Sequence, residues 1–247
     1  MELFKRKISF LGLEAGKGKI ELQSHISTNI LDFPEKFENL KQIQAFLGLV
    51  NYARKFIPNL SKLVGPLYSK TTKSGQRHFN MEDIKLVKTI KEAAKNIKPL
   101  ELPLVTDYII IEVDGCKEGW GAVLLCKPDK YSPKNIEKNC SYTSGNFNKV
   151  GLNWTSLDFE IQALINSLEK FKIFLHKEFT VRTDCEAIVR FIKNDQSKKI
   201  NRTRWINLQN VIQGCGYKIN FEHIKGKNNG IADMLSRNLN KLFSADG

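Results

Sequence analysis

The stretch IIIEVDGCKEGWGAVLL, residues 109–125, decides the fold class that the sequence predicts. Two apolar runs lie on either side of a glycine-marked turn, which is typical of two short strands joined by a tight connection. Asp114 stands where the first strand is expected to end. A lone carboxylate beside so apolar a run is costly unless another group pairs with it. The sequence therefore predicts a partner for Asp114.

The pattern around and beyond this stretch mixes strands with helices, which indicates an α/β or α+β domain built on one sheet. The predicted strands are 108–114, 119–126, 139–144, 178–184 and 216–224, and the predicted helices are 155–174, 185–194, 202–213 and 229–240.

The region before residue 100 has a different pattern. Residues 5–26 alternate and turn at Gly16–Gly18, which predicts a hairpin, and residues 33–60 place apolar side chains at helical spacing. Two further short helices are expected before a linker that Pro99 and Pro103 bracket. We therefore expect four segments, namely a hairpin segment over 1–33, a helical domain over 34–100, the α/β domain over 101–241 and a tail over 242–247.

The charge of the chain favours a polyanionic partner. The net charge is +13, and Lys plus Arg outnumber Asp plus Glu by 18 to 9 in residues 1–100 but only by 21 to 17 afterwards. A basic surface suits nucleic acid, although a generic solvated surface remains an alternative on charge alone. The five cysteines form no CxxC pair, which favours reduced thiols in an intracellular compartment. No apolar run reaches 18 residues, so we expect no membrane partner.

Three further carboxylates share the unusual placement of Asp114 beside core-facing residues. Glu160 borders the apolar stripe of the helix over 155–174, Asp184 ends a strand, and Asp233 lies on the last short helix. Two carboxylates about 5 Å apart repel by roughly 3 kcal/mol at an effective dielectric constant of about 20. If the acids converge, divalent cations are the natural compensation. The spacing alone does not establish convergence, and each acid could instead cap a helix or form an ion pair.

Four blocks in this order make the sequence similar to a known family. The blocks are EVDGCKEGWGAVLL, SLDFEIQALINSLEKFKIFL, VRTDCEAI and FEHIKGKNNGIADMLSR. They resemble the ribonuclease H domain of reverse transcriptases from plant pararetroviruses (the caulimovirus, badnavirus and tungrovirus group) and related long-terminal-repeat retroelements. Upstream, ISFLGL resembles the end of the polymerase palm, and residues 33–70 resemble the thumb of the same enzymes.

The resemblance implies a ribonuclease H-like fold, with a five-stranded mixed sheet and flanking helices behind a palm remnant and a thumb-like domain. Asp114, Glu160, Asp184 and Asp233 match the catalytic, metal-binding acids, which implies two Mg²⁺ ions with Mn²⁺ as a substitute. The implied reaction is endonucleolytic cleavage of the RNA strand of an RNA–DNA hybrid during viral reverse transcription, in the host-cell cytoplasm or the virus particle. No Tyr-x-Asp-Asp motif occurs, so the remainder of the polymerase is an expected partner.

The sequence departs from the family pattern in two places. The usual Asp-Ala-Ser block reads Asp114-Gly115-Cys116, which leaves Cys116 as either a packed thiol or a metal-sensitive position. The loop before Asp233 lacks the mobile histidine of many ribonucleases H, and Lys227 stands nearest to that position. Product release would then rely on Lys227 or on no side chain at all.

Further candidates for binding the substrate are Ser144, Gly145, Asn153, Arg202, Arg204 and Lys227. The first three flank the start of the Glu160 helix, where a phosphate could bind, but helix capping by Asn153 or Thr155 is an equal alternative. The two arginines could contact a phosphate or simply begin a solvated helix. Two other functions stay open, namely a non-catalytic nucleic-acid-binding scaffold and a related metal-dependent nuclease of a long-terminal-repeat retrotransposon.

Overall fold

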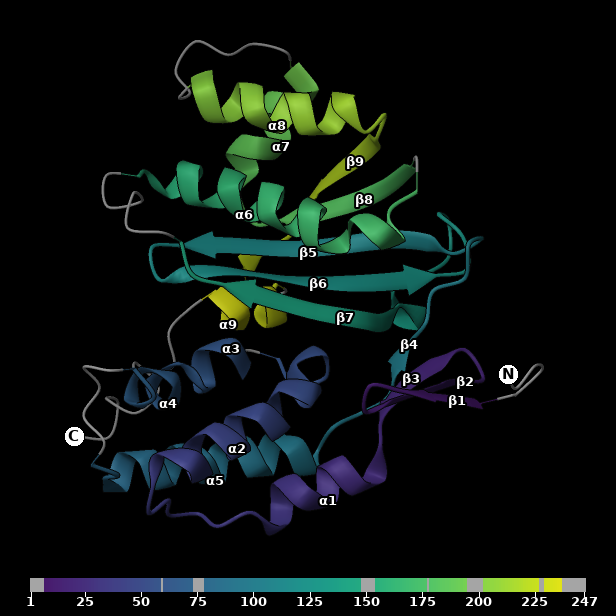
Figure 1. Cartoon of the computed structure of the whole chain (residues 1–247). Helices are drawn as coiled ribbons and strands as arrows, with labels where there is room; N and C mark the ends of the chain where they lie inside the picture. Colours follow the sequence, from purple (N-terminus) through teal and green to yellow (C-terminus); the bar gives the residue numbers. More distant parts are fainter. Residues whose placement is uncertain are drawn as a thin grey trace. The chain divides into compact units, whose positions relative to one another are not determined.

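The computed structural model describes residues 7–58, 60–72, 78–147, 154–176, 178–194, 202–226 and 229–236 (Figure 1). The chain divides into two compact units, Met1–Leu102 and Pro103–Gly247. Within the described residues, no helix has both the length and the apolar character needed to cross a membrane. All five cysteines are free.

The second unit is built on a mixed sheet of five strands in the order β7-β6-β5-β8-β9. The β5–β6 and β6–β7 pairs are antiparallel, whereas the β5–β8 and β8–β9 pairs are parallel. The expected five-stranded mixed sheet with flanking helices is therefore confirmed. The strands are β5 (Tyr108–Cys116), β6 (Gly119–Lys127), β7 (Lys138–Gly145), β8 (Glu178–Thr183) and β9 (Lys218–His223).

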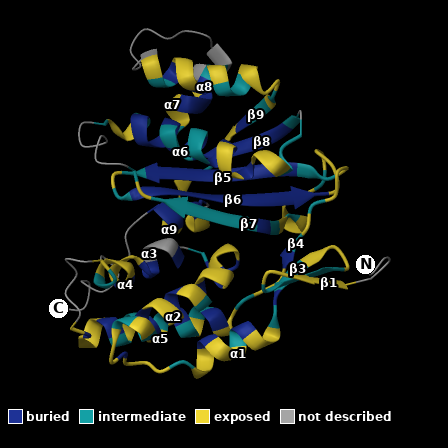
Figure 2. Ribbon diagram, in the orientation of Figure 1, coloured by how far each residue is buried: buried dark blue, intermediate teal, exposed yellow. Residues whose placement is uncertain are grey.

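Two hydrophobic clusters cover the two faces of this sheet, whose central strands are almost completely buried (Figure 2). Alternate residues of β5 belong to different clusters, because successive side chains of a strand point to opposite faces. The larger cluster includes α6 residues, and the smaller one includes Leu235 of α9. The helices of this unit are α6 (Ser156–Phe171), α7 (Glu186–Asn194), α8 (Arg202–Gly214) and α9 (Gly230–Ser236).

Two glycines allow these helices to lie close to the sheet. A Cβ at Gly115 would lie 2.5 Å from the carbonyl oxygen of Phe159 in α6, and a Cβ at Gly121 would lie 2.1 Å from the Cβ of Leu235 in α9. Either contact would push helix and strand apart. Gly115 of β5 and Gly121 of β6, on either side of the turn, are thus packing surfaces for helices on both faces of the sheet.

The first unit has a four-stranded antiparallel sheet in the order β1-β2-β3-β4. The sequence predicted one hairpin with its turn at Gly16–Gly18; the structure has that turn and a second one, at Leu11–Gly12, where both residues have positive φ. The strands are β1 (Lys7–Phe10), β2 (Leu13–Gly16), β3 (Lys19–Leu22) and β4 (Leu100–Glu101).

The helices of the first unit form an apolar core with buried side chains at helical spacing, such as Ile43, Phe46, Leu47 and Val50. The first helix starts at Ser24, within the segment that the sequence assigned to the hairpin. The helices are α1 (Ser24–Asp32), α2 (Leu40–Asn51), α3 (Leu60–Leu63), α4 (Gly65–Lys70) and α5 (Met81–Lys95).

Candidate active site

Three of the four predicted acids come together in the second unit. One carboxylate oxygen each from Asp114, Glu160 and Asp184 lies within 4.8 Å of the other two. Asp114 lies on β5, Glu160 near the start of α6, and Asp184 directly after β8. Because β5 and β8 are parallel neighbours, these two strands direct their carboxyl ends to the same edge of the sheet. The strand β5 continues two residues past Asp114, so the acid lies within the strand and not at its end.

The local sequence explains why Glu160 reaches the two aspartates. Thr155 caps α6 by accepting a hydrogen bond from the main-chain N–H of Asp158, and the Asp158 side chain accepts from the N–H of Thr155. This capping box fixes where the helix begins. Gly115 then allows the first turns of α6 to approach β5, which leaves Glu160 only 7% exposed next to Asp114, itself 4% exposed.

The electrostatics of the cluster are most unusual at Glu160. Burial raises the pKa of its carboxyl to about 9, and the charges of Asp114 and Asp184 act in the same direction. Hydrogen bonds from the N–H of Gly115 and the hydroxyl of Thr183 oppose this rise in pKa. The Oε2 atom of Glu160 is nonetheless buried without a hydrogen-bond partner.

These residues fit a divalent cation. Carboxylate oxygens are the ligands that Mg²⁺ prefers, and a cation would supply both the missing partner of Glu160 Oε2 and the charge that three adjacent acids lack. Asp114, Glu160 and Asp184 are the residues that could hold it.

The fourth acid, Asp233, does not belong to this close group. It lies half-buried on α9. The start of α9 is tied to β5 by Asn229, whose buried amide donates to the carbonyl oxygen of Val113 over 3.1 Å. The main-chain N–H of Asp233 in turn donates to the carbonyl oxygen of Asn229. Asp233 therefore belongs to a segment that is anchored beside Asp114, although its carboxylate is not among the three that converge.

The predicted substrate-binding residues are placed less uniformly. Ser144 and Gly145 are half-buried at the end of β7, where they pair with β6. Arg204 forms an ion pair with Asp158 and stacks 4.1 Å above the ring centre of Trp154. Its contact with a phosphate remains a prediction. Asn153 and Lys227 lie outside the described residues, as does the side chain of Arg202 at the start of α8.

Sequence reasoning missed several groups around the acids. Thr183 and the N–H of Gly115 donate to Glu160, and Asn229 anchors α9. His223, at the end of β9, places its Nε2 atom 3.1 Å from the main-chain oxygen of Asp184. The only sequence signal for these contacts is proximity to a candidate acid, because none of these residue types is unusual in a strand or at a helix start.

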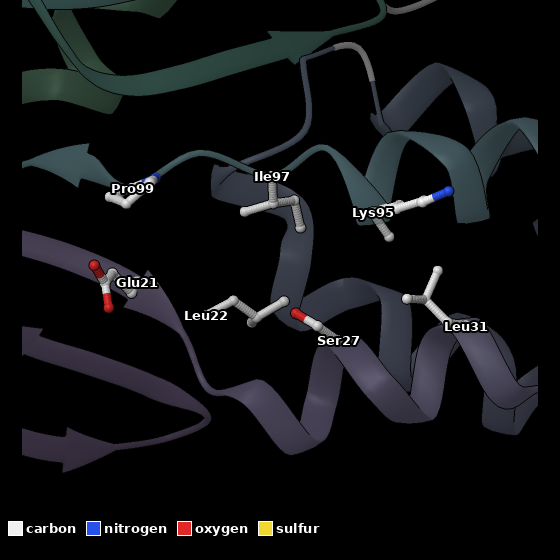
Figure 3. A pocket seen from close by; sticks show the side chains of 8 residues that line it. Glu21, Leu22, Ser27, Leu31, Lys95, Ile97 and Pro99 are labelled. Carbon is white, nitrogen blue, oxygen red and sulfur yellow. The ribbon is translucent and has the colours of Figure 1, made fainter.

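A separate pocket of about 250 Å³ lies within the first unit (Figure 3). Its side chains come from β3, α1 and the segment around α5 and β4, and they include one acid, Glu21, and one base, Lys95. The lining has no His or Cys and no second acid, so we assign no chemistry to it.

Comparisons with known proteins agree with this fold. Residues 105–211 match the family model described as an RNase H-like domain found in reverse transcriptase. The chain is 43% identical over 243 residues to Polyprotein P3 of Commelina yellow mottle virus, covering 97% of this chain and 13% of that polyprotein. It is 37% identical over 245 residues to the enzymatic polyprotein of Cauliflower mosaic virus (strain NY8153), covering 98% of this chain and 35% of that polyprotein.

The chain carries the RNase H-like domain of a viral reverse-transcriptase polyprotein. The resemblance to plant pararetroviruses read from the sequence is thereby confirmed. The chain spans about a third or less of the length of these relatives.

Solved structures of other proteins share the fold of this chain. The foamy viral protease-reverse transcriptase in complex with dsDNA matches with a TM-score of 0.68 and 22% identity, over 90% of this chain and 46% of that chain. The same viral protein in complex with an RNA/DNA hybrid matches with a TM-score of 0.68 and 22% identity, over 90% of this chain and 29% of that chain.

Proposed function

We propose that this chain is a ribonuclease H that cleaves the RNA strand of RNA–DNA hybrids with two divalent metal ions. The observation that carries the proposal is the convergence of Asp114, Glu160 and Asp184 within 4.8 Å in a buried site. Perturbed pKa values that arise from burial and like charges are typical of functional sites, and Glu160 has both causes.

The residues have distinct roles in this proposal. Asp114, Glu160 and Asp184 would hold the cations, and Glu160 would be ionised in the metal-bound site. Bound Mg²⁺, or Mn²⁺ in its place, would supply an activated water and stabilise the leaving oxygen of the phosphodiester. Asp233 is the fourth acid of the proposed site and lies on α9, outside the close group of three. The products would carry 5′-phosphate and 3′-hydroxyl ends.

The substrate class follows from chemistry and from the relatives. The 2′-hydroxyl lets such a site distinguish RNA from DNA, and a foamy viral protein of the same fold has been solved with an RNA/DNA hybrid. The excess positive charge of residues 1–100 would add phosphate contacts. The remainder of the reverse transcriptase is the expected protein partner, because the relatives are longer polyproteins.

Cleavage of a labelled RNA–DNA hybrid tests the proposal. We expect RNA cleavage with Mg²⁺, none with EDTA, and none with Asp114→Asn in Mg²⁺. A chain that binds the hybrid with Mg²⁺ but leaves its RNA strand intact would instead be the non-catalytic scaffold. Cleavage that continues in EDTA would exclude the metal-dependent mechanism.

A further inference from the structure

A second cluster of buried charges lies on the same sheet, next to the acid site. Arg182 of β8 is 5% exposed and contacts three carboxylates. Its guanidinium donates to Glu137 through two hydrogen bonds of 2.7 Å, to Glu112 of β5 over 3.2 Å and to Glu222 of β9 over 3.0 Å. The side chains of Glu112 and Glu137 are 11% and 6% exposed.

The position of this cluster in the strand register connects it with the acid site. The parallel pairing of β5 with β8 comprises three residue pairs, of which Glu112 with Arg182 is the last. Asp114 follows Glu112 by two residues in β5, and Asp184 follows Arg182 by two residues directly after β8, a step of about 7 Å at the usual rise of a strand. The two strands therefore stop pairing directly before the residues that bring the acids together.

The energetics argue against stability as the main role of this pair. Removing charges from water costs about as much as a buried ion pair regains, so well-packed apolar side chains would serve the core equally well. A long-range field on the acids is also a weak explanation, because three cations face the three carboxylates. Besides Arg182, Lys127 and Lys134 lie 4.0 and 3.9 Å from Glu137 and Glu112. The planar guanidinium of Arg182, which donates several hydrogen bonds at once, instead fixes the geometry between β8 and its neighbouring strands.

We propose that Arg182 and Glu112 are positioning residues of the acid site. Their side-chain contact fixes the last residue pair between β5 and β8. This in turn sets the distance between the carboxylates of Asp114 and Asp184. The inference rests on the proposed metal-binding function of these acids. Glu137 and Glu222 hold the remaining edges of the guanidinium and keep it in the plane that Glu112 requires.

A variant with an uncharged cluster tests this inference. In Glu112→Leu/Glu137→Gln/Arg182→Met, the guanidinium and its two buried carboxylates are removed together, and Lys127 keeps its hydrogen bond to the main-chain oxygen of Ser132. We expect this variant to fold cooperatively and to bind Mn²⁺ about tenfold more weakly than the wild-type chain, a loss typical of groups that support metal ligands. Calorimetric titration with Mn²⁺ measures the affinity, and thermal unfolding without metal measures the fold.

The same face of the sheet offers a matched control. The hydroxyl of Tyr108 lies 2.9 Å from Thr180 Oγ1, and Thr180 is two residues before Arg182, further from the acids. Tyr108→Phe/Thr180→Val also removes a polar contact between β5 and β8, but this contact is not at the last residue pair of the two strands. Its Mn²⁺ affinity should equal that of the wild-type chain.

The outcomes separate this inference from the proposed function. If the wild-type chain binds no Mn²⁺, the proposed function fails first. If the wild-type chain binds Mn²⁺ and the uncharged cluster binds it equally well, Arg182 and Glu112 are not positioning residues. Should the triple variant not fold, Arg182→Lys decides, because it keeps the charge but loses the fork. We expect Arg182→Lys to weaken Mn²⁺ binding about threefold, and unchanged binding would overturn the inference.

Discussion

Two clusters of carboxylates on neighbouring positions of one sheet have opposite electrostatics. Around Arg182, three acids share one guanidinium at 2.7 to 3.2 Å. Two residues further along the strands, three acids lie within 4.8 Å of one another, and burial raises the pKa of Glu160 to about 9. The compensated cluster belongs to the architecture of the sheet. The uncompensated one is a site whose like charges a proton on Glu160 or an added cation can balance, and such sites are typical of function.

The largest expected effect is the loss of catalysis when the uncompensated cluster loses an acid. Glu160→Gln should lower the rate of hybrid cleavage by about 10³-fold, equivalent to about 4 kcal/mol of transition-state stabilisation. Glu169→Gln is the matched control, because Glu169 is exposed on the same helix. A Glu160→Gln chain that keeps more than about a tenth of the wild-type rate would remove Glu160 from the mechanism.

The metal-free chain should lose stability as the pH rises, because Glu160 has a raised pKa in the folded state. The raised pKa means that Glu160 stays protonated when folded but ionises when unfolded, so its contribution is complete below a pH of about 4.5 and is lost as the pH rises to about 9. Between about pH 5.5 and 7.5 this loss amounts to about 3 kcal/mol. Denaturant unfolding in EDTA should show this dependence in the wild-type chain and in Glu169→Gln, but not in Glu160→Gln. Parallel curves for all three chains would contradict the shift.

A smaller effect on the free energy of unfolding should show whether Arg204 has a structural role or binds the substrate. Arg204→Ala should reduce the free energy of unfolding by about 2 kcal/mol, because the ion pair with Asp158 is mostly buried and the guanidinium stacks on Trp154. Arg190→Ala, which breaks an exposed pair with Glu186, should cost less than about 0.5 kcal/mol. If Arg204 instead contacts a phosphate, its loss will lower the salt slope of hybrid binding by about 0.9.

The smallest expected effect concerns Asp233, which lies outside the close group. Asp233→Asn should reduce the cleavage rate only about tenfold, or about 1.4 kcal/mol, because the three converging acids remain. Rates of Asp233→Asn and Glu160→Gln measured side by side on one hybrid check this ranking. Equal losses would mean that α9 closes onto the cluster when substrate binds.

The sequence predicted the sheet and its helices well because each has a strong local signal. Residues 109–125 hold two apolar runs on either side of a turn, and the α6 stripe repeats at helical spacing. It missed the turn at Leu11–Gly12, where Leu11 adopts a positive φ that is uncommon for a non-glycine residue and Gly12 is the one usual turn residue. The continuation of β5 past Asp114 was also missed, because Gly115 looks like a turn residue but serves as a contact surface for α6.

The site was predictable in composition but not in geometry. Each acid stands beside a core residue, and the family resemblance supplied the set of four. Which three converge depends on the strand register and on the approach of α6 to β5, which are long-range properties. Arg182 illustrates the same limit, because its three partners come from segments up to 70 residues away in sequence.

Anomalous diffraction from crystals grown with Mn²⁺ tests the central claim most directly. The account predicts an anomalous peak within coordination distance of carboxylate oxygens from Asp114, Glu160 and Asp184, and loss of that peak in Glu160→Gln. A wild-type crystal saturated with Mn²⁺ that shows no peak between these three acids would contradict it.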